Sequence, residues 1–204
     1  MTGRGRLLAL EGIDGCGKST QAAALAAALG AHLTHEPGAT ALGATLRHAL
    51  LAPELPEVSI RAEALLMAAD RAEHVASVIE PALAAGRWVV TDRFSGSTMA
   101  YQGYGRGLPL PELAWLVEWA AAGVRADLSI LVDVTVEEAA ARLAPSAPDR
   151  LERLGPGFAA RVRQGFLSQA ATDPIGWVVV DGTLDPVSLT THILDVVHER
   201  LGQP

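Results

Sequence analysis

The sequence contains the pattern GxxxxGK[ST] at residues 12–19, between an apolar run and a run of helix-forming residues. The apolar run at residues 7–10 predicts a buried strand, and residues 20–29 predict a helix. A strand, a glycine-rich turn and a helix in this order are typical of a phosphate-binding loop. The pattern therefore restricts the chain to folds with a strand–loop–helix unit.

The residues of this loop suit a nucleoside triphosphate. Its glycines allow backbone N–H groups to turn inward toward phosphate oxygens, and the helix N-terminus adds unpaired donors. Lys18, the only lysine of the chain, can reach the outer phosphates, and the Ser19 hydroxyl can bind Mg²⁺. A glycine-rich turn without a ligand is the less favoured alternative, because every constrained position is present. We predict that ATP contacts Gly12, Ile13, Asp14, Gly15, Cys16, Gly17, Lys18, Ser19 and Thr20.

Composition narrows the class of protein. The 204 residues suit one domain, residues 1–204, and no stretch approaches the ~20 apolar residues of a membrane span. A net charge of −7 argues against a nucleic-acid partner, since a basic face is the usual footprint of such binding. One cysteine excludes an internal disulfide. We therefore predict a cytoplasmic protein that interacts with neither membranes nor nucleic acids.

Strand and helix signals alternate along the chain, which predicts an α/β fold with a central parallel sheet and helices on both faces. The predicted strands are residues 7–10, 32–35, 88–91, 128–132 and 177–180. The predicted helices are residues 20–29, 42–51, 59–85 with a bend or break near Pro81, 111–122, 136–143, 158–171 and 186–201.

The rest of the sequence distinguishes among proteins with a phosphate loop. The chain has no asparagine and hence no Asn-Lys-x-Asp guanine motif, and it lacks the second loop lysine frequent in partitioning ATPases. Charged residues follow the predicted strands at the edge where α/β sheets bind ligands: Glu11, Glu36, Asp92, Arg93, Asp133 and Asp181. Arg47, Arg71 and Arg93 suit a second, acceptor phosphate. The alternative is that they are solvated or paired on the surface.

At this point the sequence resembles the bacterial thymidylate kinases. The resemblance rests on residues 11–20, Glu36-Pro37-Gly38, Asp92-Arg93-Phe94, residues 100–107, residues 131–135 and residues 149–152, and it extends from about residue 7 to residue 201. It implies a three-layer P-loop kinase fold with about five parallel strands. It also implies transfer of the ATP γ-phosphoryl group to dTMP with Mg²⁺, a homodimer, and a short lid around residues 143–153.

The resemblance also implies roles for individual residues. Lys18 would hold the outer ATP phosphates, and Ser19 and Asp92 would hold Mg²⁺. The acceptor nucleotide would contact Asp14, Glu36, Arg47, Met67, Arg71, Arg93, Thr98, Tyr101 and Gln102. In this set Arg47 and Arg93 would bind its phosphate, Arg71 and Thr98 would read the thymine edge, and Tyr101 would favour deoxyribose.

Two features of the site are left with alternatives. The phosphate loop contains no arginine, so we predict a catalytic cation from the lid, with Arg150 first, Arg142 second and Arg153 third; Lys18 and Arg93 complete the catalytic set. Cys16 either has a lowered thiol pKa and reacts with alkylating agents, or fills space in the loop. The remaining alternatives are a kinase for another small acceptor and a switch protein that hydrolyses ATP slowly.

Overall fold

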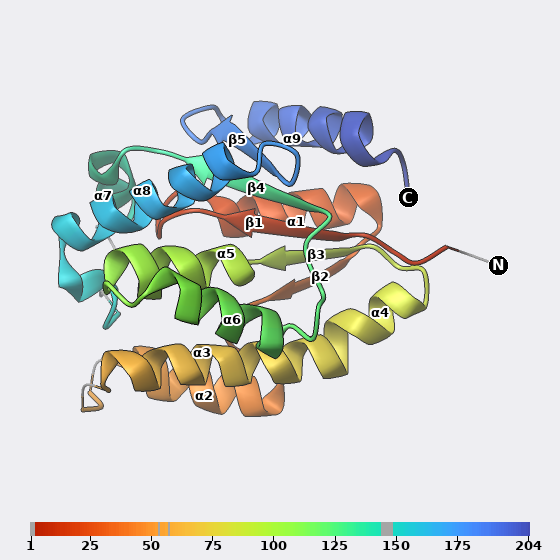
Figure 1. The fold of residues 1–204 in the computed structure, drawn as a ribbon. Coiled ribbons are helices and arrows are strands. Elements are labelled where there is room, and N and C mark those ends of the chain that lie inside the picture. The colour runs from red at the N-terminus through yellow and green to blue at the C-terminus, as the bar shows by residue number, and fades with distance from the viewer. Residues whose placement is uncertain (1–2, 53, 57, 144–148) are drawn as a thin grey trace.

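A computed structural model of the protein describes residues 3–52, 54–56, 58–143 and 149–204. Its strands form one sheet in the order β2-β3-β1-β4-β5, and each neighbouring pair is parallel (Figure 1). The strand bounds are β1 Leu7–Glu11, β2 His32–His35, β3 Val89–Asp92, β4 Leu128–Asp133 and β5 Trp177–Asp181. The predicted α/β fold with a five-stranded parallel sheet is confirmed.

Helices cover both faces of the sheet and extend beyond one of its edges (Figure 1). α1 and α9 pack against each other on one face, while α8 and the segment η2 pack together on the other. α2 and α3 form a pair beside the β2 end of the sheet. The bounds are α1 Lys18–Leu29, α2 Ala41–Leu51, α3 Ile60–His74, η1 Val75–Ile79, α4 Glu80–Ala84, α5 Ser95–Thr98, η2 Met99–Gly105, α6 Leu110–Ala120, α7 Val136–Leu143, η3 Glu152–Leu154, α8 Pro156–Thr172 and α9 Pro186–Leu201.

The central strand β1 is buried on both faces. Leu8 and Leu10 belong to the core cluster that contains α1 and α9 residues, while Leu7 and Ala9 pack with η1, α4 and Phe94. All four side chains have 0% exposure. Neighbouring residues of a strand point to opposite faces, so a continuous apolar run is what a strand covered on both sides requires.

One helical region matches the sequence prediction and another differs from it. The predicted helix over residues 59–85, with a bend or break near Pro81, forms as α3, the π-helical turn η1 and α4, and Pro81 occupies the first turn of α4. A missing N–H is tolerated in the first turn of a helix, and the π-helical turn precedes the proline. Residues 95–105 had no predicted helix, yet they form α5 and the π-helical η2.

The carboxyl ends of the central strands place the phosphate loop next to charged residues from neighbouring strands. Leu10 of β1 pairs with Asp92 of β3, and His35 of β2 also pairs with Asp92. Glu11, Glu36 and Arg93 follow directly from these pairs. Within the described part of the chain, no helix has both the length and the apolar character needed to span a bilayer.

Candidate active site

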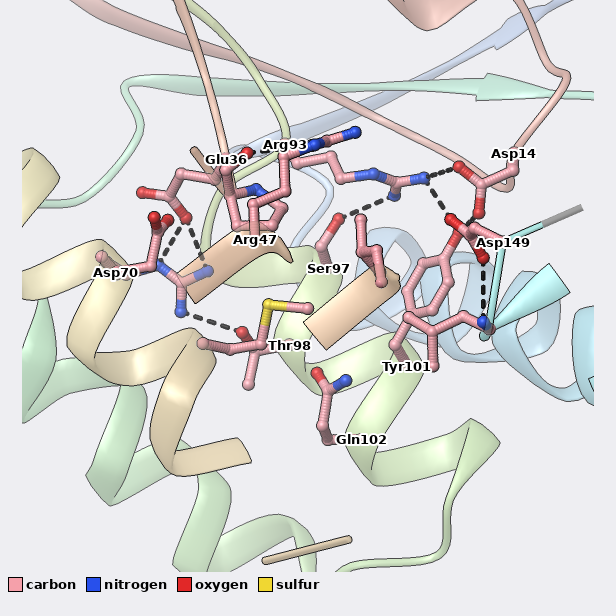
Figure 2. A pocket seen from close by; sticks show the side chains of 15 residues that line it. Asp14, Glu36, Arg47, Asp70, Arg93, Ser97, Thr98, Tyr101, Gln102 and Asp149 are labelled. Carbon is pink, nitrogen blue, oxygen red and sulfur yellow. Dashed lines mark hydrogen bonds and ion pairs between the residues drawn. The ribbon is translucent and has the colours of Figure 1, made fainter. Parts of the chain in front are cut away.

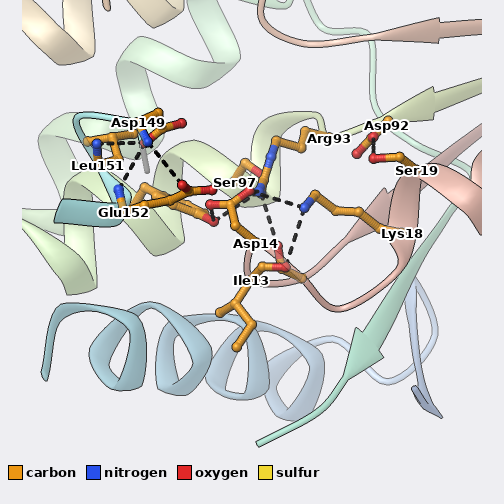
Figure 3. Close-up of polar contacts among 12 residues, drawn as sticks. Ile13, Asp14, Lys18, Ser19, Asp92, Arg93, Ser97, Asp149, Leu151 and Glu152 are labelled. Atoms are coloured by element: carbon orange, nitrogen blue, oxygen red, sulfur yellow. Dashed lines mark hydrogen bonds and ion pairs between the residues drawn. The ribbon is translucent and has the colours of Figure 1, made fainter. Parts of the chain in front are cut away.

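The phosphate loop connects β1 to α1 and has a backbone that its glycines make possible. Gly15 and Gly17 have φ angles of 82° and 96°, and Gly17 caps α1. Positive φ is accessible to glycine without a steric penalty. Lys18 is the first residue of α1, and its Nζ lies 3.3 Å from the Ile13 carbonyl oxygen and 3.4 Å from Asp14 Oδ1 (Figure 3). Because both contacts are long, the protein holds the ammonium group only weakly. The group lies at the loop that we predict to bind phosphates.

Cys16 fills space in the core, and the predicted lowering of its pKa is wrong. Its side chain has 0% exposure and packs in the core cluster of β1, α1 and β4. A Cβ added at Gly12 would lie 2.7 Å from the Cys16 Sγ, so the thiol occupies the space that this glycine leaves. Burial raises the pKa of the thiol and outweighs the opposing effect of Lys18. The thiol therefore stays protonated and shielded at neutral pH.

Ser19 and Asp92 meet at the edge of the loop, as a shared metal site requires. The Ser19 hydroxyl donates to Asp92 Oδ2 (Figure 3), and the other carboxylate oxygen, Oδ1, is buried without a partner among the described residues. A buried carboxylate oxygen normally has a partner, so an unpaired one calls for a ligand. Hydroxyl and carboxylate oxygens are the ligand types of Mg²⁺, which keeps several waters and binds substrate phosphates. These residues fit the predicted ion.

A cleft lies beside the loop (Figure 2). It brings together every residue that we predicted to contact the acceptor, from Asp14 in the loop to Gln102 in η2. Sequence reasoning missed several further lining residues, because a motif does not show which of its neighbouring positions face the cleft: Pro37, Leu51, Asp70, Ser97, Asp149 and Leu151. The lining combines three arginines with Met67, Leu51 and Leu151. Such a surface suits a ligand with both an anionic and a flat apolar part.

Arg71 stands at the back of the cleft in a buried network. Its Nε and Nη2 atoms donate to Glu36 Oε2 at 3.0 and 2.8 Å, and Nη1 donates to Thr98 Oγ1 at 2.9 Å. A further bond reaches the Phe94 carbonyl oxygen at 3.0 Å. The His74 ring contacts the other oxygen of Glu36 at 3.0 Å. Four of the five guanidinium N–H groups thus have protein acceptors, which fixes the plane of the side chain.

Asp14, Arg93 and Tyr101 link the loop to the cleft (Figure 2). Arg93 Nη2 pairs with Asp14 Oδ1 at 2.5 Å, and the Tyr101 hydroxyl donates to Asp14 Oδ2 at 2.7 Å. Burial acts to raise the pKa of Asp14, but Arg93 and Lys18 outweigh burial and hold this pKa well below its usual range. Arg93 has a φ of 73°, an uncommon backbone conformation that turns its side chain toward the loop. Asp14 is therefore ionised at neutral pH.

Gln102 and Met67 line the part of the cleft away from the loop. Gln102 donates through Nε2 to the buried Glu63 at 3.0 Å, and Arg106 pairs with the same carboxylate at 2.6 Å. Met67 is half-buried and packs against the main core cluster. Gln102 is thus oriented by a buried charge, whereas Met67 keeps the freedom of an unbranched thioether.

The first two of the three candidate lid arginines lie in different places. Arg142 donates to the carbonyl oxygen of Cys16 in the phosphate loop at 3.2 Å, and to that of Gly182 at 3.0 Å. Arg150 is buried, with 8% exposure, and its guanidinium contacts carbonyl oxygens at the C-terminal end of α2. The structure thus brings Arg142, and not Arg150, to the loop. Residues 144–148 of the predicted lid lie outside the described residues.

Comparison with known proteins identifies the family. The thymidylate kinase family model matches residues 10–193. The chain belongs to the thymidylate kinase family. It is 49% identical to the thymidylate kinase of Synechococcus sp. (strain RCC307), over 97% of this chain and 98% of that protein. It is 47% identical to the thymidylate kinase of Cupriavidus metallidurans, over 88% and 91% of the two chains. The crystal structure of the Ehrlichia chaffeensis thymidylate kinase superposes with a TM-score of 0.80 at 30% identity, over 96% of this chain and 99% of that one.

Glu11 has a role that the thymidylate kinase resemblance did not suggest to us. Its side chain has 0% exposure at the end of β1. Its Oε1 accepts the backbone N–H groups of Phe94 and Ser97 at 3.0 and 3.1 Å, and its Oε2 accepts the Ser97 hydroxyl at 2.6 Å. The carboxyl group thereby holds the turn that follows Arg93. Burial raises the pKa of Glu11 to about 7, although these hydrogen bonds oppose the shift.

We expect Glu11→Gln to become progressively more stable than the unmodified protein as pH rises. A raised folded-state pKa means that the stability contributed by protonated Glu11 is complete near pH 4.5 and is lost as pH rises to about 7. Glutamine keeps the acceptor oxygen without the charge. Thermal unfolding from pH 5 to pH 8 should show the difference in Tm, variant minus wild type, rising by on the order of 5 °C. A constant difference would show that Glu11 does not titrate in this range.

Proposed function

We propose that the phosphate loop binds ATP and that the neighbouring cleft binds dTMP, so that the chain transfers the γ-phosphoryl group to give dTDP and ADP. The chain is a nucleoside monophosphate kinase by family. The observation that supports the site assignment best is the shared boundary between loop and cleft, where Asp14 of the loop lines the cleft and pairs with Arg93. Donor and acceptor phosphates held on either side of this pair would approach each other directly.

The proposed mechanism is positioning with charge stabilisation. An ionised acceptor phosphate oxygen is already a nucleophile, so the reaction needs no general base. Lys18 and the loop N–H groups would hold the donor phosphates, while Arg47 and Arg93 would hold the acceptor phosphate. In this scheme Arg93 exchanges its Asp14 partner for a phosphate oxygen. Fixing both reactants in line removes much of the entropic cost of the transfer.

We assign Mg²⁺ to Ser19 and Asp92, on the strength of the unpaired Asp92 Oδ1. When bound, the ion would neutralise phosphate charge during the transfer. Arg142 is the lid arginine best placed to add a second cation, since its guanidinium already contacts the loop backbone at Cys16. Its side chain is 36% exposed, so it can shift toward a bound nucleotide.

In this proposal, Arg71 and Met67 of the cleft select the base of the acceptor nucleotide. Arg71 has one guanidinium N–H that is not used by the bonds to Glu36, Thr98 and Phe94, and we assign this group to the acceptor base. Met67 would support the ring. Sulfur–aromatic contacts contribute about 0.3–1.5 kcal/mol, comparable to the ~0.5–1.5 kcal/mol of an aromatic pair beyond its buried area. The base should bind well but in an adaptable pocket.

Met67→Phe is therefore expected to sharpen the preference for dTMP over dUMP by a few fold with little change in kcat. A rigid ring on this wall would adapt less than a flexible thioether to a base that lacks the thymine methyl group, so dUMP should bind relatively less well. The measurement is kcat/KM for both nucleotides in wild type and variant. An unchanged ratio would remove Met67 from base selection and leave the kinase assignment intact.

We also propose that two copies of the chain associate through α3 and α6. Large apolar side chains on these helices are exposed, with Leu65 at 59%, Trp115 at 67% and Trp119 at 69%. The centroids of the two stacked tryptophan rings lie 5.9 Å apart, and a groove runs between α3 and α6 beside Leu65 and Trp115. Exposed apolar patches of this kind mark interaction sites. The family resemblance makes a second copy the proposed occupant.

Replacing both Leu65 and Trp115 with glutamate should convert the dimer to a monomer, because it would bury carboxylates without partners. Sedimentation velocity measures the change, and Val187→Glu is a control because Val187 is exposed at 76% on the distant α9. A wild-type monomer, or a variant that stays dimeric, contradicts this interface.

Three coarser predictions complete the assignment. We propose that residues 1–204 form one kinase domain and that the protein works in the cytoplasm, where its buried thiol would remain reduced. We include no nucleic-acid partner, because the net charge of −7 disfavours binding to a polyanion.

The proposed activity is tested by coupling ADP release to ATP, Mg²⁺ and a panel of nucleoside monophosphates. We expect ADP release to depend on the acceptor and to be fastest with dTMP. A preference for another nucleotide would support the alternative small-molecule kinase. If ADP is released at the same rate with and without each nucleoside monophosphate, the result would support the alternative of a switch protein that hydrolyses ATP slowly.

A further inference from the structure

Asp149 and Glu152 use their carboxylates to build a turn. Asp149 Oδ1 accepts the N–H groups of Leu151 and Glu152 at 2.8 and 2.9 Å, and Glu152 Oε2 accepts the N–H of Asp149 at 3.0 Å (Figure 3). This reciprocal pattern is a capping box, here at the start of η3. The two acidic side chains therefore fix the backbone of residues 149–152, which we call the capped turn.

Arg150 joins the capped turn to the end of α2. Its guanidinium donates to the carbonyl oxygens of Ala49 at 2.7 Å, of Leu50 at 2.8 Å, and of Pro56 at 2.8 Å. Its backbone N–H reaches the carbonyl oxygen of Leu51. α2 ends at Leu51, so these helix carbonyls have no partner within the helix, and a cation there also interacts favourably with the helix dipole. Arg150 thus satisfies the last three carbonyl groups of α2, while the Ala52 N–H satisfies that of His48.

Both elements that Arg150 joins contribute walls of the acceptor cleft. Arg47 and Leu51 line it from α2, and Asp149 and Leu151 line it from the capped turn. Leu151 is 6% exposed and packs in the main core cluster, so the turn is seated on the core. A fixed distance between the capped turn and α2 therefore sets the width of the cleft and the position of Arg47.

We propose that Arg150 is a positioning residue that clamps α2 to the capped turn and so shapes the acceptor cleft. This inference rests on the proposed binding of dTMP in that cleft. It replaces the predicted role of Arg150 as a cation on the transferring phosphoryl group. That role would require the guanidinium to leave several carbonyl acceptors and to expose a buried side chain, whereas Arg142 already contacts the phosphate loop.

The test is steady-state kinetics with each substrate varied in Arg150→Ala, Arg150→Lys and Arg87→Ala. Loss of the clamp should raise KM for dTMP at least tenfold, lower kcat less than threefold and leave KM for ATP unchanged. Arg150→Lys should not restore KM for dTMP, because one compact ammonium group cannot donate to several separated carbonyl oxygens as the planar guanidinium does. Arg87 is exposed before the amino end of β3, whereas the cleft lies at the carboxyl ends of the strands, so Arg87→Ala removes the same charge away from the cleft and should behave like wild type.

Amide hydrogen exchange on the nucleotide-free protein gives a readout that does not depend on activity. In Arg150→Lys, exchange should accelerate in the last turn of α2 and in the capped turn, and remain unchanged in α9. The proposal is overturned if kcat falls tenfold or more at constant KM for dTMP, if lysine restores activity, or if exchange at α2 does not change. If the wild-type enzyme does not phosphorylate dTMP, the proposed function is refuted. The hydrogen-exchange result would still test whether Arg150 clamps α2 to the capped turn.

Discussion

Lys18→Ala is expected to lower kcat by about 10²–10³-fold or more while the protein remains folded. The loss is large because a preorganised cation beside the transferring group acts on charge that develops in the transition state. The effect on stability should be small, since the Lys18 contacts to Ile13 and Asp14 are long, at 3.3 and 3.4 Å. Initial rates and thermal unfolding of the same preparation measure both effects.

A variant that preserves part of the Lys18 side chain separates the charge from packing. Lys18→Met keeps the aliphatic stem in a side chain position that is 6% exposed, and it should lose as much activity as the alanine variant. Near-normal turnover in either variant would contradict the assignment of the phosphate loop as the ATP site.

Arg71→Ala is expected to remove both acceptor binding and a large share of stability. Arg71 and Glu36 are 2% and 5% exposed, so truncating the arginine leaves a buried carboxylate without its cation. Breaking such a pair costs about 3–5 kcal/mol, which corresponds to a fall in Tm of roughly 6–20 °C for a chain of this size. The exposed Arg87 provides a matched control, and Arg87→Ala should change stability by less than about 0.5 kcal/mol.

A second substitution tests the cause of the Arg71 effect. Adding Glu36→Gln to Arg71→Ala removes the uncompensated charge and should recover part of the lost stability, yet acceptor binding should remain impaired. Calorimetry and KM for dTMP distinguish the two outcomes. If the double variant is no more stable than Arg71→Ala, the buried charge is not what destabilises the single variant.

Four of the five strands could be predicted from the sequence because each is a short, mainly apolar run followed by a charged or turn residue. β2, with the sequence HLTH, could be placed only by the turn Glu36-Pro37-Gly38 that follows it. The run at residues 7–10 fills both faces of the sheet, and only a central strand needs such a pattern. The cleft residues predicted to contact the acceptor could be listed from the family resemblance, but further lining residues such as Leu51 and Asp70 could not. Their convergence depends on the parallel register, which brings Glu11, Asp92 and the end of β2 to one edge.

The helix over residues 95–105 could not be predicted, because its glycines weaken the local preference for a helix. Tertiary packing explains why glycine occupies these positions. A Cβ at Gly96 would lie 2.6 Å from Cη2 of Trp177, and one at Gly105 would lie 2.6 Å from Cε2 of Phe158. The glycines therefore permit close packing of a helix that the fold stabilises.

The position of Arg150 was beyond sequence reasoning, and the sequence left two alternatives open for Cys16. A motif gives the order of residues but not which backbone carbonyls remain unsatisfied, and the end of α2 is distant in sequence from Arg150. For Cys16, proximity to Lys18 suggested a lowered pKa, but complete burial has the larger effect. In both cases the deciding quantity is a tertiary contact.

The most direct test of the account follows the label from [γ-³²P]ATP in a single turnover with excess enzyme, Mg²⁺ and dTMP. Transfer between adjoining sites predicts that the label appears in dTDP at the rate at which ATP disappears, and that Lys18→Ala slows both equally. Release of the label as inorganic phosphate, with dTMP unchanged, would contradict the central claim that the loop and the cleft form one phosphotransfer site.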